Sequence, residues 1–216
     1  MADTPLFPVW RLSRLRMATD GHGVTALVCA QGCPLDCKYC INPGSKTFND
    51  PMRRVTAKEL YDTVKKDGLY YTATGGGVTF GGGEPLLHTA FIAEFRKTIP
   101  SEWRIYAETS LFVPEQNVLE AAISVDGFFV DIKDTNKEIY KNYTGKDNAL
   151  PLKNLNILIK AAGADKITVR VPLIPGYNTD GDRSATVDYL HGIGITDIDL
   201  FRYTVRKQSA EKESGK

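Results

Sequence analysis

The sequence predicts an α/β fold in which parallel strands alternate with helices on the outside. Short apolar runs rich in β-branched and aromatic residues alternate along the chain with longer stretches of helical spacing. Such alternation is typical of strand–helix–strand units that build a parallel sheet. Six units can be traced, which is too few to close an eight-unit barrel. We therefore expect an open sheet.

The units follow one another along most of the chain. Strands are predicted at residues 24–30, 78–81, 104–107, 127–131, 167–173 and 197–201. Helices are predicted between them, at residues 57–66, 89–98, 114–122, 152–162 and 182–190. Thr56 and Asp182 stand at the start of the first and last helix, and both residue types favour the N-cap position.

One domain accounts for nearly the whole chain. No repeat, linker or low-complexity block interrupts residues 1–205. A chain of 216 residues that is 42% hydrophobic can bury a substantial core without disulfides. Residues 206–216 are polar, and we expect them to form a disordered tail.

Charge and hydropathy argue against several classes of protein. The 27 basic and 26 acidic residues give a formal charge of +1, with no sign of a nucleic-acid or membrane-binding patch. The apolar runs are strand-sized and do not reach the length of a membrane span. The N-terminus lacks the basic start and apolar core of a signal peptide. We expect a cytoplasmic protein, and a monomer.

Three closely spaced cysteines are the most informative chemical feature. Cys33, Cys37 and Cys40 form the pattern CxxxCxxC after the first predicted strand. Three soft thiolates can hold three irons of a cubane cluster and leave the fourth iron open to a substrate. A closed zinc site needs a fourth ligand, which is missing at finger-like spacing, and a redox thiol set is a further alternative. Cys29 lies in an apolar run, where we expect it to pack as a small buried residue.

A glycine-rich segment, residues 74–85, is the second informative feature. Its central residues favour a strand, and glycine triplets stand on both sides of them. Gly81, Gly82 and Gly83 carry no side chain, so a ligand can approach the backbone closely, and Glu84 adds a carboxylate beside them. A flexible turn that leads into a helix is the alternative.

Taken together, the two motifs resemble those of the radical S-adenosylmethionine (SAM) enzymes. The resemblance is most specific to the activating enzymes of glycyl radical enzymes, of the pyruvate formate-lyase activase type, and it runs from about Asp20 to Tyr203. The resemblance implies a partial (β/α)6 TIM-like barrel, the radical SAM core. It is carried by residues 20–23, 31–33, 75–79, 130–133, 143–145 and 169–176.

Polar residues fall at the ends of the predicted strands, where ligands gather in parallel sheets. Glu108 and Thr109 follow the third strand, Asp131 and Lys133 end the fourth, and Arg170 lies within the fifth. Charges within or beside an apolar strand usually need a functional reason. This argument favours a functional role for Asp131 and Lys133, and position adds Glu108, Thr109 and Arg170 as candidates.

The resemblance implies a [4Fe-4S] cluster on the three cysteines and SAM on its open iron. By position, Glu84 and the backbone of the preceding glycines would bind the SAM amino group, and Asn42 would help to hold the cofactor. Lys133 would pair with a carboxylate, as a compact positive charge can. The ribose and carboxylate contacts match Glu108, Asp131 and Lys133.

Some activases of this type also bind a monovalent cation beside the SAM carboxylate. The matching oxygens are those of Glu108, Thr109 and Asp131 and the backbone oxygen of Phe129. The usual residue at Glu108 is aspartate, so the additional methylene counts against this cation site.

The reaction implied is reductive cleavage of SAM to methionine and a 5′-deoxyadenosyl radical, which removes a hydrogen atom from a glycine of a partner glycyl radical enzyme. A flavodoxin or ferredoxin would donate the electron. Arg170 matches a position that contacts the partner peptide, and Asp20 lies in another such segment.

The chain departs from the activase pattern mainly on the substrate side. Ile41 replaces a histidine before Asn42, His22 stands in the segment that usually reads Asp-Gly-Pro-Gly, and Thr204 stands about where a late histidine is usual. A radical SAM enzyme that modifies another peptide or a small molecule is therefore the alternative. A non-catalytic metal-binding module is a third hypothesis, and it leaves the glycine-rich segment unexplained.

Overall fold

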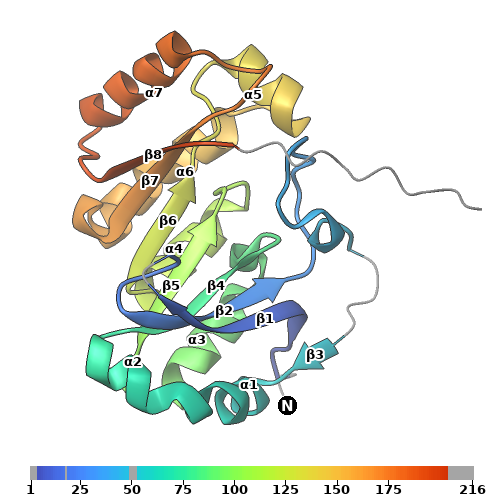
Figure 1. Cartoon of the computed structure of the whole chain (residues 1–216), viewed down its shortest axis with the longest axis vertical. Helices are drawn as coiled ribbons and strands as arrows, with labels where there is room; N and C mark the ends of the chain where they lie inside the picture. The colour runs from blue at the N-terminus through green and yellow to red at the C-terminus, as the bar shows by residue number, and fades with distance from the viewer. Residues whose placement is uncertain (1–3, 18, 49–52, 204–216) are drawn as a thin grey trace, which may run out of the picture.

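The fold is a curved, open sheet of eight strands with helices on its outer face (Figure 1). A computed structural model describes residues 4–17, 19–48 and 53–203. The strand order is β3-β1-β2-β4-β5-β6-β7-β8. The strands are β1 (Phe7–Met17), β2 (Val24–Ala30), β3 (Arg53–Val55), β4 (Gly77–Gly82), β5 (Arg104–Thr109), β6 (Gly127–Asp131), β7 (Ile167–Leu173) and β8 (Ile198–Arg202).

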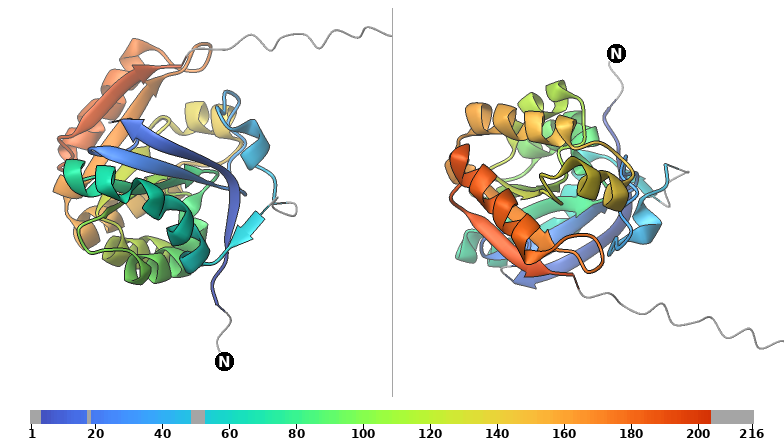
Figure 2. Two further views of the ribbon diagram at one scale, coloured as in Figure 1. Left: turned by 60° about the horizontal axis from the view of Figure 1, so that its bottom comes forward. Right: turned by 90° about the horizontal axis from the view of Figure 1, so that it is seen from above.

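Most of the helices connect one strand to the next and lie outside the curved sheet (Figure 2). The α-helices are α1 (Ala57–Val64), α2 (Gly68–Thr74), α3 (Thr89–Thr98), α4 (Glu115–Ser124), α5 (Lys137–Thr144), α6 (Ala149–Ala162) and α7 (Asp180–Gly192). Short 3-10 turns are η1 (Pro43–Ser45), η2 (Lys65–Asp67), η3 (Pro85–His88) and η4 (Ala164–Lys166).

The predicted parallel strands are all present. Six strands, β2, β4, β5, β6, β7 and β8, pair in parallel with one another in this order. Two strands were not predicted: β1 pairs antiparallel with β2, and β3 pairs antiparallel with β1. The chain therefore adds an antiparallel edge to the six parallel strands that the sequence predicts.

One predicted helix cap is confirmed and the other is wrong. Thr56 caps α1 in a capping box, in which its side chain accepts a hydrogen bond from Glu59 N. In α7, Asp182 is the third helical residue, and Thr179 is the N-cap that accepts from Asp182 N. The helix thus begins before the predicted position because the capping pair is Thr179 with Asp182.

The outer face of the sheet packs apolar side chains against the helices, whereas the concave face carries charged side chains. On the outer face, Phe80 of β4 packs on Phe91 and Phe95 of α3, with ring centroids 6.2 and 5.5 Å apart. Because side chains alternate along a strand, the neighbouring position Gly81 faces inward. An added Cβ there would meet the carboxylate of Glu108 at 2.7 Å. The concave face is therefore the one on which charged groups gather.

Cys29 is buried, as predicted, but its surroundings are not the apolar core. It is 2% exposed and lies outside the main cluster of buried hydrophobic residues, which contains its neighbours Val28 and Ala30. Burial raises the pKa of its thiol to about 11. Cys29 therefore belongs to the concave face.

Two further observations concern the chain as a whole. No helix within residues 4–17, 19–48 and 53–203 has the length and apolar character needed to cross a membrane. The predicted tail, residues 206–216, and Thr204 lie outside the described residues. The division into one domain and a tail stays a prediction.

Candidate functional site

The three cysteines lie in the loop that follows β2, at its C-terminal end. Cys33, Cys37 and Cys40 are free thiols and half-buried. The backbone N–H groups on either side of Cys37 are bonded to the end of α5: Asp36 N donates to Thr144 O at 2.9 Å, and Lys38 N donates to Tyr143 O at 3.2 Å. Backbone hydrogen bonds to the end of α5 therefore hold the cysteine loop in place.

The thiols of Cys33 and Cys37 need a positive partner to ionise in this loop. Burial raises the pKa of Cys33 to about 12 and also raises the pKa of Cys37. Metal ions supply such a partner, because a coordinating thiol is deprotonated. Among the described residues, no three Cys, His, Asp or Glu side chains converge on a single metal ion. A cubane does not require this convergence, because each of its cysteines binds a different iron. The donor set therefore fits an iron–sulfur cluster.

The glycine-rich segment is bonded directly to the cysteine loop. Gly83 N donates to Ala30 O at 3.0 Å, and Glu84 N donates to Gly32 O at 2.8 Å. A Cβ at Gly83 would lie 2.3 Å from Gly32 O, so the two backbones meet at a distance that excludes side chains. The alternative is half right: Glu84 caps the turn η3 that leads into α3, but the glycines before it form strand β4 and its contact with the cysteine loop instead of a free turn. The two motifs predicted from the sequence form one structure.

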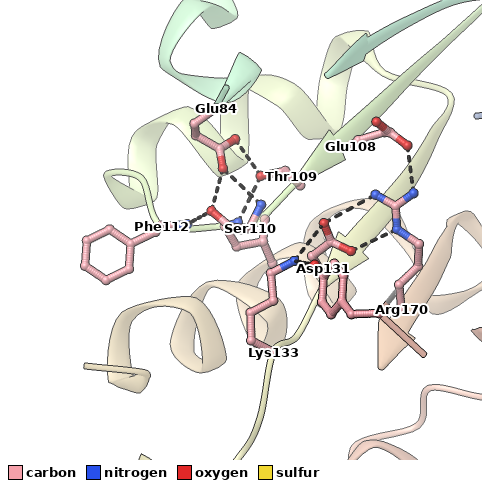
Figure 3. Close-up of polar contacts among 10 residues, drawn as sticks. Glu84, Glu108, Thr109, Ser110, Phe112, Asp131, Lys133 and Arg170 are labelled. Carbon is pink, nitrogen blue, oxygen red and sulfur yellow. Dashed lines mark hydrogen bonds and ion pairs between the residues drawn. The ribbon is translucent and has the colours of Figure 1, made fainter. Parts of the chain in front are cut away.

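Glu84 is buried and holds the loop after β5 (Figure 3). Its Oε1 accepts from Thr109 Oγ1 at 2.7 Å and from Leu86 N at 3.3 Å. Its Oε2 accepts from Ser110 N at 2.9 Å and from Ser110 Oγ at 2.6 Å. A carboxylate offers about four acceptor positions, so all of them are in use. Burial raises the pKa of Glu84, and the bonds from Ser110 and Thr109 oppose this effect.

A row of ion pairs crosses the concave face from β5 to β7 (Figure 3). Arg170 Nη1 donates to Glu108 Oε1 at 2.7 Å, and Arg170 Nε donates to Asp131 Oδ1 at 2.9 Å. Lys133 Nζ lies 3.2 Å from Asp131 Oδ2 and donates to Tyr203 Oη at 3.1 Å. Asp131 and Arg170 are direct partners in the β6–β7 register, which sets them side by side.

The electrostatics of this row follow from burial and from the two cations. Burial raises the pKa of Glu108, and Arg170 only partly offsets that rise. Burial also acts on Asp131, but the charges of Lys133 and Arg170 outweigh it and hold its pKa below the ordinary value. The charge of Asp131 raises the pKa of Lys133 in spite of burial. Lys133 and Arg170 are therefore positively charged at neutral pH.

The remaining predicted residues lie around this centre. Asn42 begins the turn η1, where its carbonyl oxygen accepts from Ser45 N at 3.0 Å. Thr109 turns its hydroxyl toward Glu84 instead of toward Glu108 and Asp131. The Asp20 carboxylate is buried and paired with Arg16. The structure therefore brings together the cysteine loop, the glycines, Glu84 and the ion-pair row.

Sequence reasoning missed three residues of this centre. Ser110 supplies two of the donors to Glu84, Tyr203 binds Lys133, and Tyr140 of α5 lies buried near Cys37. Helix α5 itself was missed, although Asn136 and Gly145 are recognisable start and stop signals.

Comparison with known proteins agrees with this geometry. The family described as the Radical SAM superfamily matches residues 27–190. The chain belongs to the radical SAM superfamily. The match begins within β2 and ends within α7, so it includes both the cysteine loop and the glycine-rich segment.

Curated relatives of this radical SAM chain are activating enzymes. The (2S)-3-sulfopropanediol dehydratase activating enzyme of Klebsiella oxytoca is 36% identical over an alignment of 150 residues, and the match covers 67% of this chain and 47% of that protein. The pyruvate formate-lyase-activating enzyme of Staphylococcus aureus is 31% identical over an alignment of 173 residues, and the match covers 76% of this chain and 67% of that protein. The chain therefore belongs to the activating-enzyme family, and it spans about half the length of the Klebsiella relative.

Solved structures confirm the radical SAM fold. Streptococcus suis SuiB, in complex with its precursor peptide SuiA, superposes with a TM-score of 0.63 at 14% identity, over 82% of this chain and 39% of that chain. A domain of a pyruvate-formate lyase-activating enzyme from Bacteroides vulgatus gives a TM-score of 0.52 at 26% identity, over 62% of this chain and 86% of that chain. The predicted α/β partial barrel is thus confirmed.

Proposed function

We propose that this protein cleaves SAM reductively at a [4Fe-4S] cluster and uses the radical to remove a hydrogen atom from a glycine of a partner glycyl radical enzyme. One observation carries the proposal. The cysteine loop and the Gly81–Glu84 segment are joined backbone to backbone at the carboxyl end of the parallel strands. This arrangement puts a cluster ligand set beside a bare backbone, with a row of charges across the same face.

Cys33, Cys37 and Cys40 would hold the cluster, which when bound supplies one electron to the sulfonium of SAM. The protein's residues would bind and orient SAM. Lys133 has three N–H donors; within residues 4–17, 19–48 and 53–203, Asp131 and Tyr203 use two of them, and the third would bind the methionine carboxylate.

The amino group of SAM requires acceptors near the glycines. The backbone carbonyls of this segment can serve, because no Cβ blocks their approach. Glu84 joins them if one of its four donors turns away. The hydroxyl of Ser110 can do so, since its rotation leaves the backbone bond from Ser110 N intact. Asn42 would complete the cofactor contacts.

Two observations support a protein substrate. The relatives named above are activating enzymes of pyruvate formate-lyase and of a dehydratase. Arg170 has five N–H donors and uses three of them on Asp131 and Glu108; the other two, which no described residue accepts, would bind a substrate backbone.

The remaining partners are also part of the proposal. A flavodoxin or ferredoxin would deliver the electron to a monomeric, cytoplasmic enzyme. A monovalent cation would need the carboxylates of Glu108 and Asp131, which Arg170 already bridges. A cation can therefore bind there only if the guanidinium moves.

Anaerobic SAM cleavage tests the proposal. The protein is reconstituted with iron and sulfide and reduced with dithionite, SAM is added, and 5′-deoxyadenosine is measured by chromatography. We expect product from the wild type and none from the variant in which Cys33, Cys37 and Cys40 are all alanine. A cluster-loaded wild type that makes no 5′-deoxyadenosine, with or without a candidate partner, contradicts the proposal.

The partner is tested by electron paramagnetic resonance (EPR). A glycyl radical signal in a partner enzyme, formed only with SAM and this protein, supports the activase function. Cleavage of SAM coupled to a modified peptide or small molecule, with no glycyl radical in any candidate partner, would establish the alternative radical SAM function.

A further inference from the structure

A buried hydroxyl without a partner lies beside the cysteine loop. Tyr140 is 1% exposed, and its Oη makes no hydrogen bond to any described residue. A buried tyrosine hydroxyl usually finds a partner, because leaving the group unpaired costs free energy. Tyr140 therefore has a hydroxyl donor that no residue described by the structure accepts.

Tyr140 belongs to the helix that holds the cysteine loop. The last carbonyls of α5 accept the N–H groups on both sides of Cys37, and the helix lies next to this loop in Figures 1 and 2. Tyr140 stands one turn before Thr144 and shares the buried face of α5 with Tyr143 and Thr144. Thr144 Oγ1 also donates to Tyr140 O at 2.8 Å, which fixes the backbone of this turn.

The surroundings of the Tyr140 hydroxyl are those of the proposed active site. Burial raises the pKa of Tyr140, and the ionisable groups near it are Cys37, Lys133, Glu84 and Cys33. The acceptors among them are occupied. Glu84 already receives four hydrogen bonds, and Lys133 is a donor. Among these four groups only the sulfurs of Cys33 and Cys37 remain as acceptors, and in this structure the hydroxyl is not hydrogen-bonded to either of them.

We propose that the Tyr140 hydroxyl donates a hydrogen bond to a sulfur of the cluster that Cys33, Cys37 and Cys40 would hold, and that this bond sets the reduction potential of the cluster. The inference rests on the proposed function. A hydrogen bond to a cluster sulfur stabilises the added negative charge of the reduced state and so raises the potential. Tyr140 would thereby make the cluster easier to reduce.

The test is Tyr140→Phe, which keeps the ring and removes only the hydroxyl. Wild type and variant are reconstituted anaerobically, and the potential is measured without SAM by redox titration, with EPR of the reduced cluster as the signal. We expect a more negative potential in Tyr140→Phe, with the iron and sulfide content of the wild type. Tyr71→Phe is the matched control, because Tyr71 is equally buried but lies in α2 within the apolar core, where its hydroxyl lies 3.5 Å from Asp67. Its potential should equal that of the wild type.

An unchanged potential in Tyr140→Phe overturns the inference, and so does an equal shift in Tyr71→Phe. A loss of SAM affinity without a shift in potential would identify SAM as the acceptor, which also overturns it. If Tyr140→Phe loses its cluster, pulsed EPR of the reduced wild type in H2O and D2O decides. We expect an exchangeable proton coupled to the cluster, and its absence refutes the bond. A wild type that assembles no cluster would instead refute the proposed function.

Discussion

Replacing Arg170 with glutamine should destabilise the protein in a pH-dependent way. Arg170 bridges Glu108 and Asp131 on the concave face of the sheet. In Arg170→Gln, Asp131 keeps Lys133 at 3.2 Å, whereas Glu108 loses its only hydrogen-bonded partner among the described residues. The cost therefore falls mainly on Glu108.

The size of the effect follows from burial. Removing one partner of a buried ion pair costs about 3–5 kcal/mol, because an uncompensated charge is left behind. The side chains of Arg170 and Glu108 are 18% and 16% exposed, so some solvent reaches the pair. We expect a loss near the lower limit, about 3 kcal/mol, where Glu108 is ionised.

The pH dependence has a definite sign. Burial already holds the pKa of Glu108 above its ordinary value, and without Arg170 it rises further. The native state then keeps a proton that the unfolded chain releases, so stability falls as the pH rises between the unfolded and the native pKa. The difference between wild type and Arg170→Gln should therefore be small near pH ~4.5 and reach its full size near pH ~8.

Urea unfolding followed by circular dichroism measures this difference. Arg183→Gln is the control, because its ion pair with Asp180 lies at the surface and should contribute less than about 1 kcal/mol. The double variant Arg170→Gln/Glu108→Gln should recover part of the loss, since no charge is left unpaired. A loss below about 1 kcal/mol near pH ~8, or an equal loss at both pH values, refutes the reasoning.

Three further substitutions test other parts of the site. Cys37→Ala should abolish the four-iron cluster, and an intact four-iron spectrum in this variant would exclude Cys37 as a ligand. Glu84→Gln should lower SAM affinity by roughly 10–100-fold while the iron content is kept, because charged hydrogen bonds contribute about 1.5–3 kcal/mol; equilibrium dialysis measures the affinity, and an unchanged value contradicts the role of Glu84. Asn154→Ala should cost about 2–4 kcal/mol in urea unfolding, because the Asn154 amide donates to Leu111 O at 2.9 Å and to Val113 O at 2.8 Å. A cost below about 1 kcal/mol would mean that the loop after β5 does not depend on Asn154.

The parallel strands could be predicted because their apolar runs are unambiguous. The predicted ranges for β2, β6, β7 and α3 agree with the structure at both ends. Strand β1 was missed because arginines interrupt its pattern. Arg14 is accommodated by Asp67 at 2.6 Å, a partner 53 residues away, and such a contact is invisible in the sequence.

Helix α5 was missed for a different reason. Its eight residues include two tyrosines, an asparagine and a threonine, which are weak helix formers. Its ends are set by the side chain of Asn136, which accepts from Glu138 N and Ile139 N, and by Gly145 at φ +78°. Packing on the cysteine loop stabilises the helix, and this packing depends on the tertiary fold.

The residues of the site could be listed from strand ends, but their partners could not. Position predicted that Glu84, Lys133 and Arg170 would gather at one edge. It did not predict that Glu84 would be saturated by Ser110, Thr109 and Leu86 N, or that Arg170 would bridge two carboxylates. Side-chain direction decides these contacts, and it depends on the register of strands that are distant in the sequence.

Gly81 links the two halves of the site through Glu108. The missing side chain of Gly81 leaves the space in which the Glu108 carboxylate lies, since an added Cβ would come within 2.7 Å of Oε2. From that position Glu108 reaches Arg170, which its Oε1 contacts at 2.7 Å. The Glu108 side chain thus extends into the space that the missing side chain of Gly81 leaves. In the proposed function, the glycine whose bare backbone would face SAM also makes room for the carboxylate that fixes Arg170, so the cofactor contacts and the position of Arg170 would depend on the same residue.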